Sequence, residues 1–349
     1  MPSPLFFART VHGLEGLAAT ELESLGCTIV SHGKRQLILR APGDRDEQPR
    51  LLDDLFALLA STEDPGRTKA GLDRAVARLR PVENDEPYSI TASFAGARNY
   101  NRYDIEDAVA RIIGGRYQSR RGGVQPPPGT ADFRVSLGPS GLLVGRRVAD
   151  RPLHRRAWKV ATIAGTLHPP VAAAMAQLAD IKPGHRVIDP CCGAGTLLIE
   201  AAGLCPGAEF RGSDISVDAL TAAAVNGPHL GWKQYDTTRL PDATGSVDRI
   251  IVNPPWGVRL PALRATAERE WHRVLRPGGI LVCLIPGPPP RQADAGPPGG
   301  RVEAGLAGGR VEAGLAGGLF GAGLTGWRVE AAYPISLAGQ HPWIVVARR

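Results

Sequence analysis

The sequence predicts an α/β protein, in which a C-terminal parallel sheet covered by helices follows smaller α+β segments. Strand-like apolar runs alternate with helical segments from residue 186 to residue 285. A glycine-rich turn separates the first of these strands from its helix, at residues 189–196. Four successive strand-like runs end in acidic or amide side chains, at Asp189, Asp214, Asp236 and Asn253. Because ligands of doubly wound sheets bind at the carboxyl ends of the strands, this order predicts a nucleotide-type site there.

The N-terminal segments predict an α+β arrangement. Residues 6–39 are expected to form a strand, a helix over 13–25 and two further strands, since leucines recur on one face of that helix. Residues 51–59 are apolar and bracketed by Pro49 and Pro65, and we predict a helix there. Residues 86–149 alternate between strand and helix, with a Gly/Pro-rich loop at 122–129.

The C-terminal half predicts a seven-stranded sheet. An apolar helix at 169–178 leads into it, and a helix at 262–274 and a strand at 280–285 follow Asn253. Runs at 327–333 and 343–347 predict a final antiparallel hairpin. Before this hairpin, residues 286–326 hold a Pro/Gly linker and two tandem copies of Arg-Val-Glu-Ala-Gly-Leu-Ala-Gly-Gly. Two nine-residue copies cannot bury a core, so we interpret this segment as a low-complexity insertion.

The Asn253-Pro254-Pro255-Trp256 motif predicts chemistry on an amino group of a nucleobase. The amide oxygen of Asn253 and the carbonyl of Pro254 can accept both hydrogens of one exocyclic amine, which directs its lone pair at an electrophile. Proline holds the turn rigid and has no N–H. Trp256 offers a face on which an extruded base can stack.

The glycine-rich turn predicts the site of the electrophile. Gly193 and Gly195 allow close approach of a ligand to the backbone, and the helix that starts at Thr196 presents free N–H groups. Asp214 is placed to bind ribose hydroxyls, and Asp236 to bind an adenine amino group. Cys191 and Cys192 could form a redox pair, half of a metal site or a nucleophile. Without a second cysteine pair or a histidine cluster, we favour small side chains that line the ligand site.

These residues resemble the class I S-adenosylmethionine-dependent methyltransferases, and within them the THUMP-containing RNA guanine-N2 methyltransferases. Asp189, Pro190, Cys192, Gly193, Gly195 and Thr196 match the family's loop, whereas Cys191 and Ala194 depart from it. Trp256 departs from the tyrosine that usually ends the family's Asn-Pro-Pro-Tyr motif. The resemblance implies a Rossmann-like catalytic domain, S-adenosyl-L-methionine as cofactor and no metal. It implies cofactor binding by Asp189, Cys192, Gly193, Gly195, Thr196, Asp214 and Asp236, and catalysis by Asn253, Pro254 and Trp256.

Upstream segments extend the resemblance and predict four parts of the chain. Residues 6–26 are similar to the ferredoxin-like opening of these enzymes, and residues 96–109 to a THUMP domain. We therefore expect a ferredoxin-like domain at 1–60, a THUMP-like RNA-binding domain at 61–150, a basic linker at 151–165 and the methyltransferase domain at 166–349.

The basic residues gather in one segment. Residues 96–159 contain 13 Lys and Arg against 5 Asp and Glu, whereas the whole chain has a net charge of +7. Aromatic residues interleave with them, a composition typical of RNA binding. The alternative is an arginine-rich solvated surface. The residues expected to contact RNA are Arg98, Tyr100, Arg102, Arg155, Arg156 and Lys159.

The sequence thus favours an RNA methyltransferase that forms N2-methylguanosine in tRNA, in the acceptor stem. The alternatives are an N6-adenine methyltransferase on DNA or rRNA, and a non-catalytic RNA-binding scaffold. Five cysteines do not indicate a disulfide framework, and no long apolar run or leader is present. We therefore expect a cytoplasmic protein with tRNA as partner, no membrane association and no protein partner.

Overall fold

The structure is a computed structural model that describes residues 4–41, 48–139, 141–255, 261–286 and 326–349, without the side chains of residues 261–264. The chain divides into two compact units, which we describe separately. The first comprises Met1–Thr10 and Ala18–Leu153, and the second comprises Val11–Leu17 and His154–Arg349. Each contains one seven-stranded sheet. The predicted fold class, an α/β catalytic part preceded by α+β segments, is confirmed.

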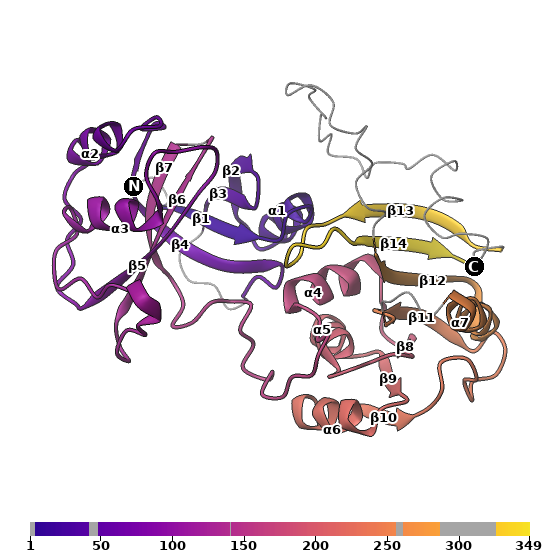
Figure 1. Cartoon of the computed structure of the whole chain (residues 1–349). Helices are drawn as coiled ribbons and strands as arrows, with labels where there is room; N and C mark the ends of the chain where they lie inside the picture. The colour runs from indigo at the N-terminus through magenta and orange to yellow at the C-terminus, as the bar shows by residue number, and fades with distance from the viewer. Residues whose placement is uncertain (1–3, 42–47, 140, 256–260, 287–325) are drawn as a thin grey trace. The chain divides into compact units, whose positions relative to one another are not determined.

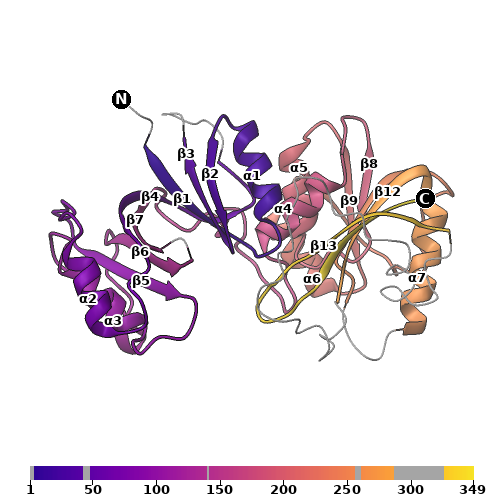
Figure 2. The same ribbon diagram turned by 90° about the horizontal axis from the view of Figure 1, so that it is seen from above.

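The sheet of the first unit has the strand order β2-β3-β1-β4-β7-β6-β5 and is antiparallel except for the pair β5 and β6. Helices α2 and α3 lie side by side against one of its faces (Figures 1 and 2). The elements are β1 (Leu5–Thr10), α1 (Glu15–Ser24), β2 (Thr28–Gly33), β3 (Gln36–Arg40), β4 (Leu52–Thr62), α2 (Lys69–Ala77), β5 (Tyr88–Phe94), α3 (Arg102–Ala110), a short 3-10 helix η1 (Arg121–Gly123), β6 (Ala131–Gly138) and β7 (Gly141–Arg147).

Alternation along the strands builds the core of this unit. Phe133 and Val135 of β6 are buried with Leu72 of α2 and Ile105 of α3 in one cluster. Helix α3 begins where it does because the Asn101 side chain accepts hydrogen bonds from two first-turn amides, while Asp104 accepts one from the Asn101 amide.

The helix predicted at residues 51–59 is wrong, since residues 52–59 belong to strand β4. This strand pairs with β1 on one side and β7 on the other, so both of its edges are occupied. Its buried Asp54 accepts a hydrogen bond of 2.8 Å from the Arg147 Nε of β7. Pairing with distant strands has overridden a local apolar pattern that fits a helix equally well.

The sheet of the second unit has the order β10-β9-β8-β11-β12-β14-β13. Its first five strands are parallel, and β14 runs antiparallel between β12 and β13. Helices α4 and α5 lie on one side of this sheet and α7 on the other (Figure 2). The elements are α4 (Pro169–Leu178), β8 (Arg186–Asp189), α5 (Thr196–Leu204), β9 (Glu209–Asp214), α6 (Val217–Asn226), β10 (Gly231–Gln234), β11 (Val247–Val252), α7 (Pro261–Val274), β12 (Leu275–Ile285), β13 (Arg328–Pro334) and β14 (Trp343–Arg348).

The last three residues of the central strand β11 are apolar because helices cover both faces of the sheet. Ile250, Ile251 and Val252 of β11 are fully buried. The apolar helix at 169–178 and the final hairpin are confirmed. Trp256 and most of the predicted insertion lie outside the described residues.

The predicted domain boundaries stay predictions. The boundary at residue 60 falls within β4, and the strands on both sides of it share one sheet. Among the described residues, no helix has both the length and the apolar character that crossing a membrane requires.

Candidate active site

A cavity of about 690 Å³ opens at the carboxyl ends of the parallel strands in the second unit. Strands β8, β9 and β11 each deliver a side chain to its wall, at Asp189, Asp214 and Asn253. Most of the residues predicted for the cofactor and for catalysis line this one cavity: Asp189, Cys192, Gly193, Thr196, Asp214, Asp236, Asn253 and Pro254.

The glycine-rich turn connects β8 to α5 in a conformation that requires glycine. Gly193 and Gly195 have φ values of +52° and +83°. Gly195 caps α5 and does not line the cavity; a Cβ atom there would lie 2.7 Å from the Trp232 ring. Its part in the site is therefore close packing behind the loop.

Asp189 is the most deeply buried carboxyl group of the cavity. Its Oδ1 accepts a hydrogen bond of 3.1 Å from the Cys191 amide. Its Oδ2 and the Thr196 Oγ1 are buried and have no hydrogen-bond partner among the described residues. Burial, with a smaller contribution from Asp214, holds the pKa of Asp189 well above its usual range. This wall of the cavity thus suits a ligand that brings a cationic hydrogen-bond donor.

Asp214 is held rigidly at the end of β9. One carboxylate oxygen accepts a hydrogen bond of 2.9 Å from the Gly193 amide, and the other accepts one of 3.0 Å from the Ser216 amide. Each oxygen keeps a further lone pair. The side chain can therefore accept hydrogen bonds from two neighbouring hydroxyl groups of a ligand.

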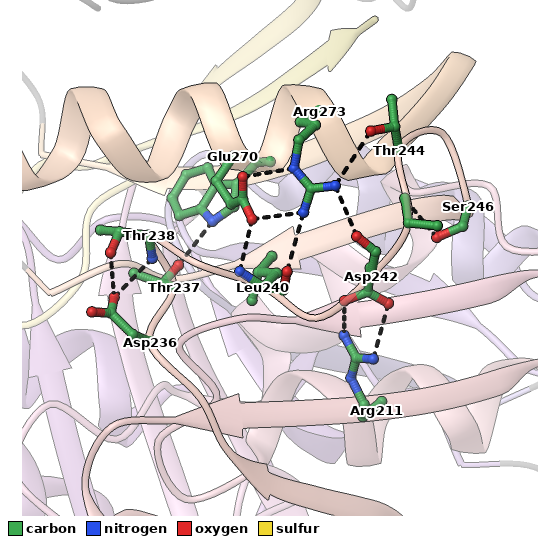
Figure 3. Close-up of polar contacts among 12 residues, drawn as sticks. Arg211, Asp236, Thr237, Thr238, Leu240, Asp242, Thr244, Ser246, Glu270 and Arg273 are labelled. Carbon is green, nitrogen blue, oxygen red and sulfur yellow. Dashed lines mark hydrogen bonds and ion pairs between the residues drawn. The ribbon is translucent and has the colours of Figure 1, made fainter.

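Asp236 is the most exposed of the three aspartates that line the cavity. Its Oδ1 accepts hydrogen bonds from the Thr238 amide at 2.8 Å and from the Thr238 hydroxyl at 2.7 Å, and these bonds lower the pKa of Asp236 (Figure 3). The carboxylate is therefore ionised and oriented at neutral pH.

Helix α7 anchors the loop that carries Asp236. The indole N–H of Trp271 donates to the Thr237 Oγ1 at 2.9 Å, and Thr237 lines the cavity. Glu270 accepts from the Leu240 amide at 2.7 Å, while Arg273 donates to the Leu240 carbonyl at 3.1 Å and to Glu270 (Figure 3). The contacts of α7 with Thr237 and Leu240 were not predicted from the sequence, since they join residues 30 to 34 positions apart.

Asn253 presents an unused acceptor. It follows β11 directly, and its Oδ1 is buried without a hydrogen-bond partner among the described residues. Pro254 and Pro255 continue the cavity wall beside it. The chain here offers the Asn253 side-chain oxygen to a donor group in the cavity.

Asn226 is a residue of this site that the sequence did not reveal. It is 4% exposed at the end of α6. Its Oδ1 accepts from the amides of Val160 and Ala161 at 3.0 and 2.9 Å, and its Nδ2 donates to the carbonyls of Ala161 and Ala194 at 2.9 and 3.0 Å. It thereby ties the segment that continues into the cavity wall at residues 163–167 to the glycine-rich loop. The sequence did not reveal this role because an Asn followed by a Gly indicates only the end of a helix.

The thiols of Cys191 and Cys192 are unsuited to act as nucleophiles. Burial raises the pKa of both Cys191 and Cys192 far above the ordinary thiol value, and Asp189 adds to the effect. Both thiols are therefore protonated at neutral pH, and we interpret them as lining of the cavity.

Two of the predicted RNA-binding residues in the first unit have intramolecular partners. Arg98, with a side chain 7% exposed, pairs with Asp64 and donates to the Gly66 carbonyl at 2.9 Å. Tyr100 is buried, and its hydroxyl donates to the same carbonyl at 2.8 Å. Arg102 is exposed at the start of α3, where it donates to the Tyr103 hydroxyl at 2.6 Å and its guanidinium lies over the Tyr103 ring.

The predicted RNA-binding residues of the second unit differ in the same way. Arg156 forms an ion pair of 2.6 Å with the fully buried Glu200. Lys159 donates to the Leu167 carbonyl at 2.9 Å, and burial lowers its pKa. Arg155 is exposed. RNA contact by all six residues stays a prediction, and it is favoured most for Arg102 and Arg155.

Comparison with known proteins gives a consistent result. Residues 156–288 match the family described as "RMKL-like, methyltransferase domain". Over 301 residues the chain is 32% identical to the tRNA (guanine(6)-N2)-methyltransferase of Thermus thermophilus, covering 80% of this chain and 86% of that protein. It is 27% identical to the enzyme of the same name from Archaeoglobus fulgidus, over 78% of each chain. The crystal structure of TrmN from Thermus thermophilus shares the fold with a TM-score of 0.68, at 24% identity and over 99% of both chains.

Proposed function

This chain belongs to the family of S-adenosylmethionine-dependent RNA guanine-N2 methyltransferases, and we propose that its substrate is tRNA and its target a guanosine of the acceptor stem. The two relatives compared above are both named for guanine 6 of tRNA. In the standard numbering of tRNA, that position lies in the acceptor stem. The agreement of both names supports this position for the target.

The observation that carries the proposal is the buried, unpartnered Oδ1 of Asn253 beside Pro254, in the cavity that also holds the unpartnered Oδ2 of Asp189. An unused buried acceptor is costly, by about 1–3 kcal/mol, and is retained where a ligand completes it. One acceptor suits an amine of the substrate and the other an ammonium group of the cofactor.

The residues of the cavity fit S-adenosyl-L-methionine. We propose that Asp189 receives its ammonium group, Asp214 its ribose hydroxyls and Asp236 its adenine amine, with Cys192, Gly193 and Thr196 enclosing it and Gly195 shaping the turn. When bound, the cofactor supplies a methyl group that is electrophilic because it is attached to a sulfonium. An ammonium group that reaches the buried Asp189 would favour the ionised form of this carboxyl, whose pKa burial raises.

Asn253 and Pro254 are proposed to orient the target amine. Each accepts one hydrogen of the guanine N2 group, which withdraws the nitrogen lone pair from the ring and directs it along the line of attack. Asn253 is an amide and takes no proton. Its contribution is positional and electrostatic, a mode worth several orders of magnitude in well-ordered sites. Trp256 is proposed to stack on the extruded base.

We further propose that Arg102 and Arg155 contact RNA phosphates, with Arg98, Tyr100, Arg156 and Lys159 holding the surrounding segments in place. The cytoplasm is the proposed location. All five cysteines are free thiols, as is usual in reducing compartments.

The test is methylation of defined transcripts by the full chain. A tRNA transcript with guanosine at position 6 is incubated with isotope-labelled S-adenosylmethionine, and its nucleosides are separated by mass spectrometry. We expect labelled N2-methylguanosine, and none in a matched transcript in which the base pair at that position is inverted. Label in N6-methyladenosine, or equal label in the inverted transcript, would overturn the proposal.

A further inference from the structure

The strand order divides the wall of the cavity into two sides. Asp189, Asp214 and the loop of Asp236 follow β8, β9 and β10, whereas Asn253 follows β11 in the middle of the sheet. On the other side of β11, the described lining residues come from β12 and from the loop between β13 and β14. They are Leu284, Leu337, Ala338 and Gln340. If the cofactor occupies the acidic side, the target base lies on this second side. Among the described residues of the second side, Gln340 carries the one polar side chain.

The loop that carries Gln340 is a tight turn. Leu337 and Gln340 exchange both backbone hydrogen bonds, at 3.0 and 2.9 Å. Ala338 and Gly339, between them, have φ values of 49° and 80°. Positive φ at both central residues is the pattern of the turns that suit a twisted hairpin. Because its backbone is closed on itself, this loop presents the Gln340 side chain from a defined position.

A segment from the start of the chain fixes the same loop within the second unit. The Ser336 amide donates to the His12 carbonyl at 2.9 Å. Gly13 has a φ of +95°, and a Cβ atom there would lie 2.0 Å from the Pro334 carbonyl oxygen. Only glycine permits this approach. The position of the loop is therefore fixed before a substrate binds, which a residue that recognises the substrate requires.

The Gln340 amide is available to a ligand. Its side chain is exposed and makes no hydrogen bond to any residue that the structure describes. A carboxamide offers one acceptor oxygen and a donor N–H₂ in one plane. It can therefore satisfy a neighbouring donor and acceptor on the edge of a planar ring.

Guanine has that pair of groups next to its exocyclic amine. With N2 held by Asn253 and Pro254, the rest of the edge is the N1–H donor and the O6 acceptor. We propose that Gln340 determines base specificity, with its Oε1 accepting from N1–H and its Nε2 donating to O6; this inference rests on the proposed function. Adenine held by its N6 amine offers N1, an acceptor, and no ring N–H, so the amide makes one bond to it instead of two.

The test uses a nucleoside that keeps the reacting amine and lacks the recognised groups. In 2-aminopurine riboside, O6 is absent and N1 carries no hydrogen, while the amine remains on C2. A tRNA carrying it at the target position is compared with the guanosine form, using wild-type protein and Gln340→Leu. For wild type, we expect kcat/KM on 2-aminopurine to be on the order of 100-fold lower, as when polar groups of a site lose their partners.

Gln340→Leu keeps the size of the side chain and removes both hydrogen bonds. We expect its kcat/KM on guanosine to fall by a similar factor, and its kcat/KM on 2-aminopurine to stay close to wild type. The ratio of the variant's kcat/KM on guanosine to its kcat/KM on 2-aminopurine then reports only the intrinsic difference in reactivity between the two amines. Gln340→Glu keeps the acceptor and loses the donor, so its ratio should be intermediate. Affinity for S-adenosylmethionine and the melting temperature should not change.

The two proposals fail in different ways. If wild-type protein forms no N2-methylguanosine in the guanosine transcript, the proposed function fails. If wild type methylates guanosine but Gln340→Leu keeps the wild-type preference over 2-aminopurine, the function stands and the inference about Gln340 is wrong. A loss of cofactor affinity in Gln340→Leu equal to its loss of activity would also overturn it, since the residue would then be structural.

Discussion

Replacing Asn226 tests whether one buried amide holds the cofactor cavity together. Asn226→Ala removes four hydrogen bonds that tie residues 160 and 161 to the Ala194 carbonyl in the glycine-rich loop. A typical bond contributes about 0.5–1.5 kcal/mol net, and the buried Ala194 carbonyl would lose a partner. Val160 is 70% exposed, so its amide can turn to water instead. We therefore expect a loss of about 2–4 kcal/mol.

Tryptophan fluorescence reports this loss from the second unit alone, because all six tryptophans lie beyond His154. Unfolding in urea should shift to a midpoint about 1–2 M lower, given ordinary denaturant slopes. Affinity for S-adenosylmethionine, measured by calorimetry, should fall at least tenfold, since the segment held by Asn226 continues into the cavity wall.

Two control variants separate the hydrogen bonds from side-chain size. Asn226→Asp is isosteric but sets a carboxylate against two carbonyl oxygens, so at pH 7 it should be no more stable than Asn226→Ala. Thr221→Ala, on the same helix, removes only an exposed hydroxyl bonded to the Val217 carbonyl. It should change stability by less than about 0.5 kcal/mol. Wild-type stability and cofactor affinity in Asn226→Ala would refute the reasoning.

Three further predictions concern chemistry, charge and RNA. Asn253→Ala should lower kcat by about 10²–10³-fold with cofactor affinity within twofold of wild type, because the amide orients the amine alone; a parallel loss in calorimetry would assign Asn253 to cofactor binding. Asp189→Asn should weaken cofactor binding yet raise the melting temperature of the cofactor-free protein. The raised pKa of Asp189 means that its contribution to stability is present at low pH and is lost as pH rises through the folded-state pKa. The gain should therefore be larger at pH 8 than at pH 4, and scanning calorimetry that finds the reverse would contradict it. Arg155→Glu should weaken tRNA binding and reduce its salt slope by roughly one unit, the value for one lost phosphate contact, with unchanged cofactor affinity; an unmoved slope would mean that this arginine is only solvated.

The strand ends of the catalytic sheet could be predicted from the sequence because each one combines two local signals. Apolar residues mark β8 and β11 as buried strands, and a polar residue ends or directly follows each strand, including the less apolar β9. Parallel strands bring all such ends to one edge, so Asp189, Asp214 and Asn253 meet without any knowledge of distant contacts.

What could not be predicted depends on pairs of residues far apart in the chain. Arg98 and Arg156 belong to a basic segment, but their charges are directed at Asp64 and Glu200. The Trp271 indole donates a hydrogen bond to Thr237 in the loop after β10, and Asn226 donates one to the Ala194 carbonyl in the glycine-rich loop. Strand β4 has a local pattern that fits either structure, and only its two neighbouring strands decide it. Composition shows how many charged and apolar residues a segment contains. These features depend instead on which distant residue each side chain or strand pairs with.

The place of β14 between β12 and β13 has a consequence for how the protein is made. During synthesis, β13 emerges before β14, yet it has no strand to pair with until β14 has added to β12. The edge of β12 stays open in the meantime, and an unpaired strand edge promotes aggregation in a nascent chain. The turn that carries Gln340 forms only when β14 arrives. A chain truncated within β14 would therefore keep the acidic side of the cavity but lack the strand that holds the turn of Gln340 against it.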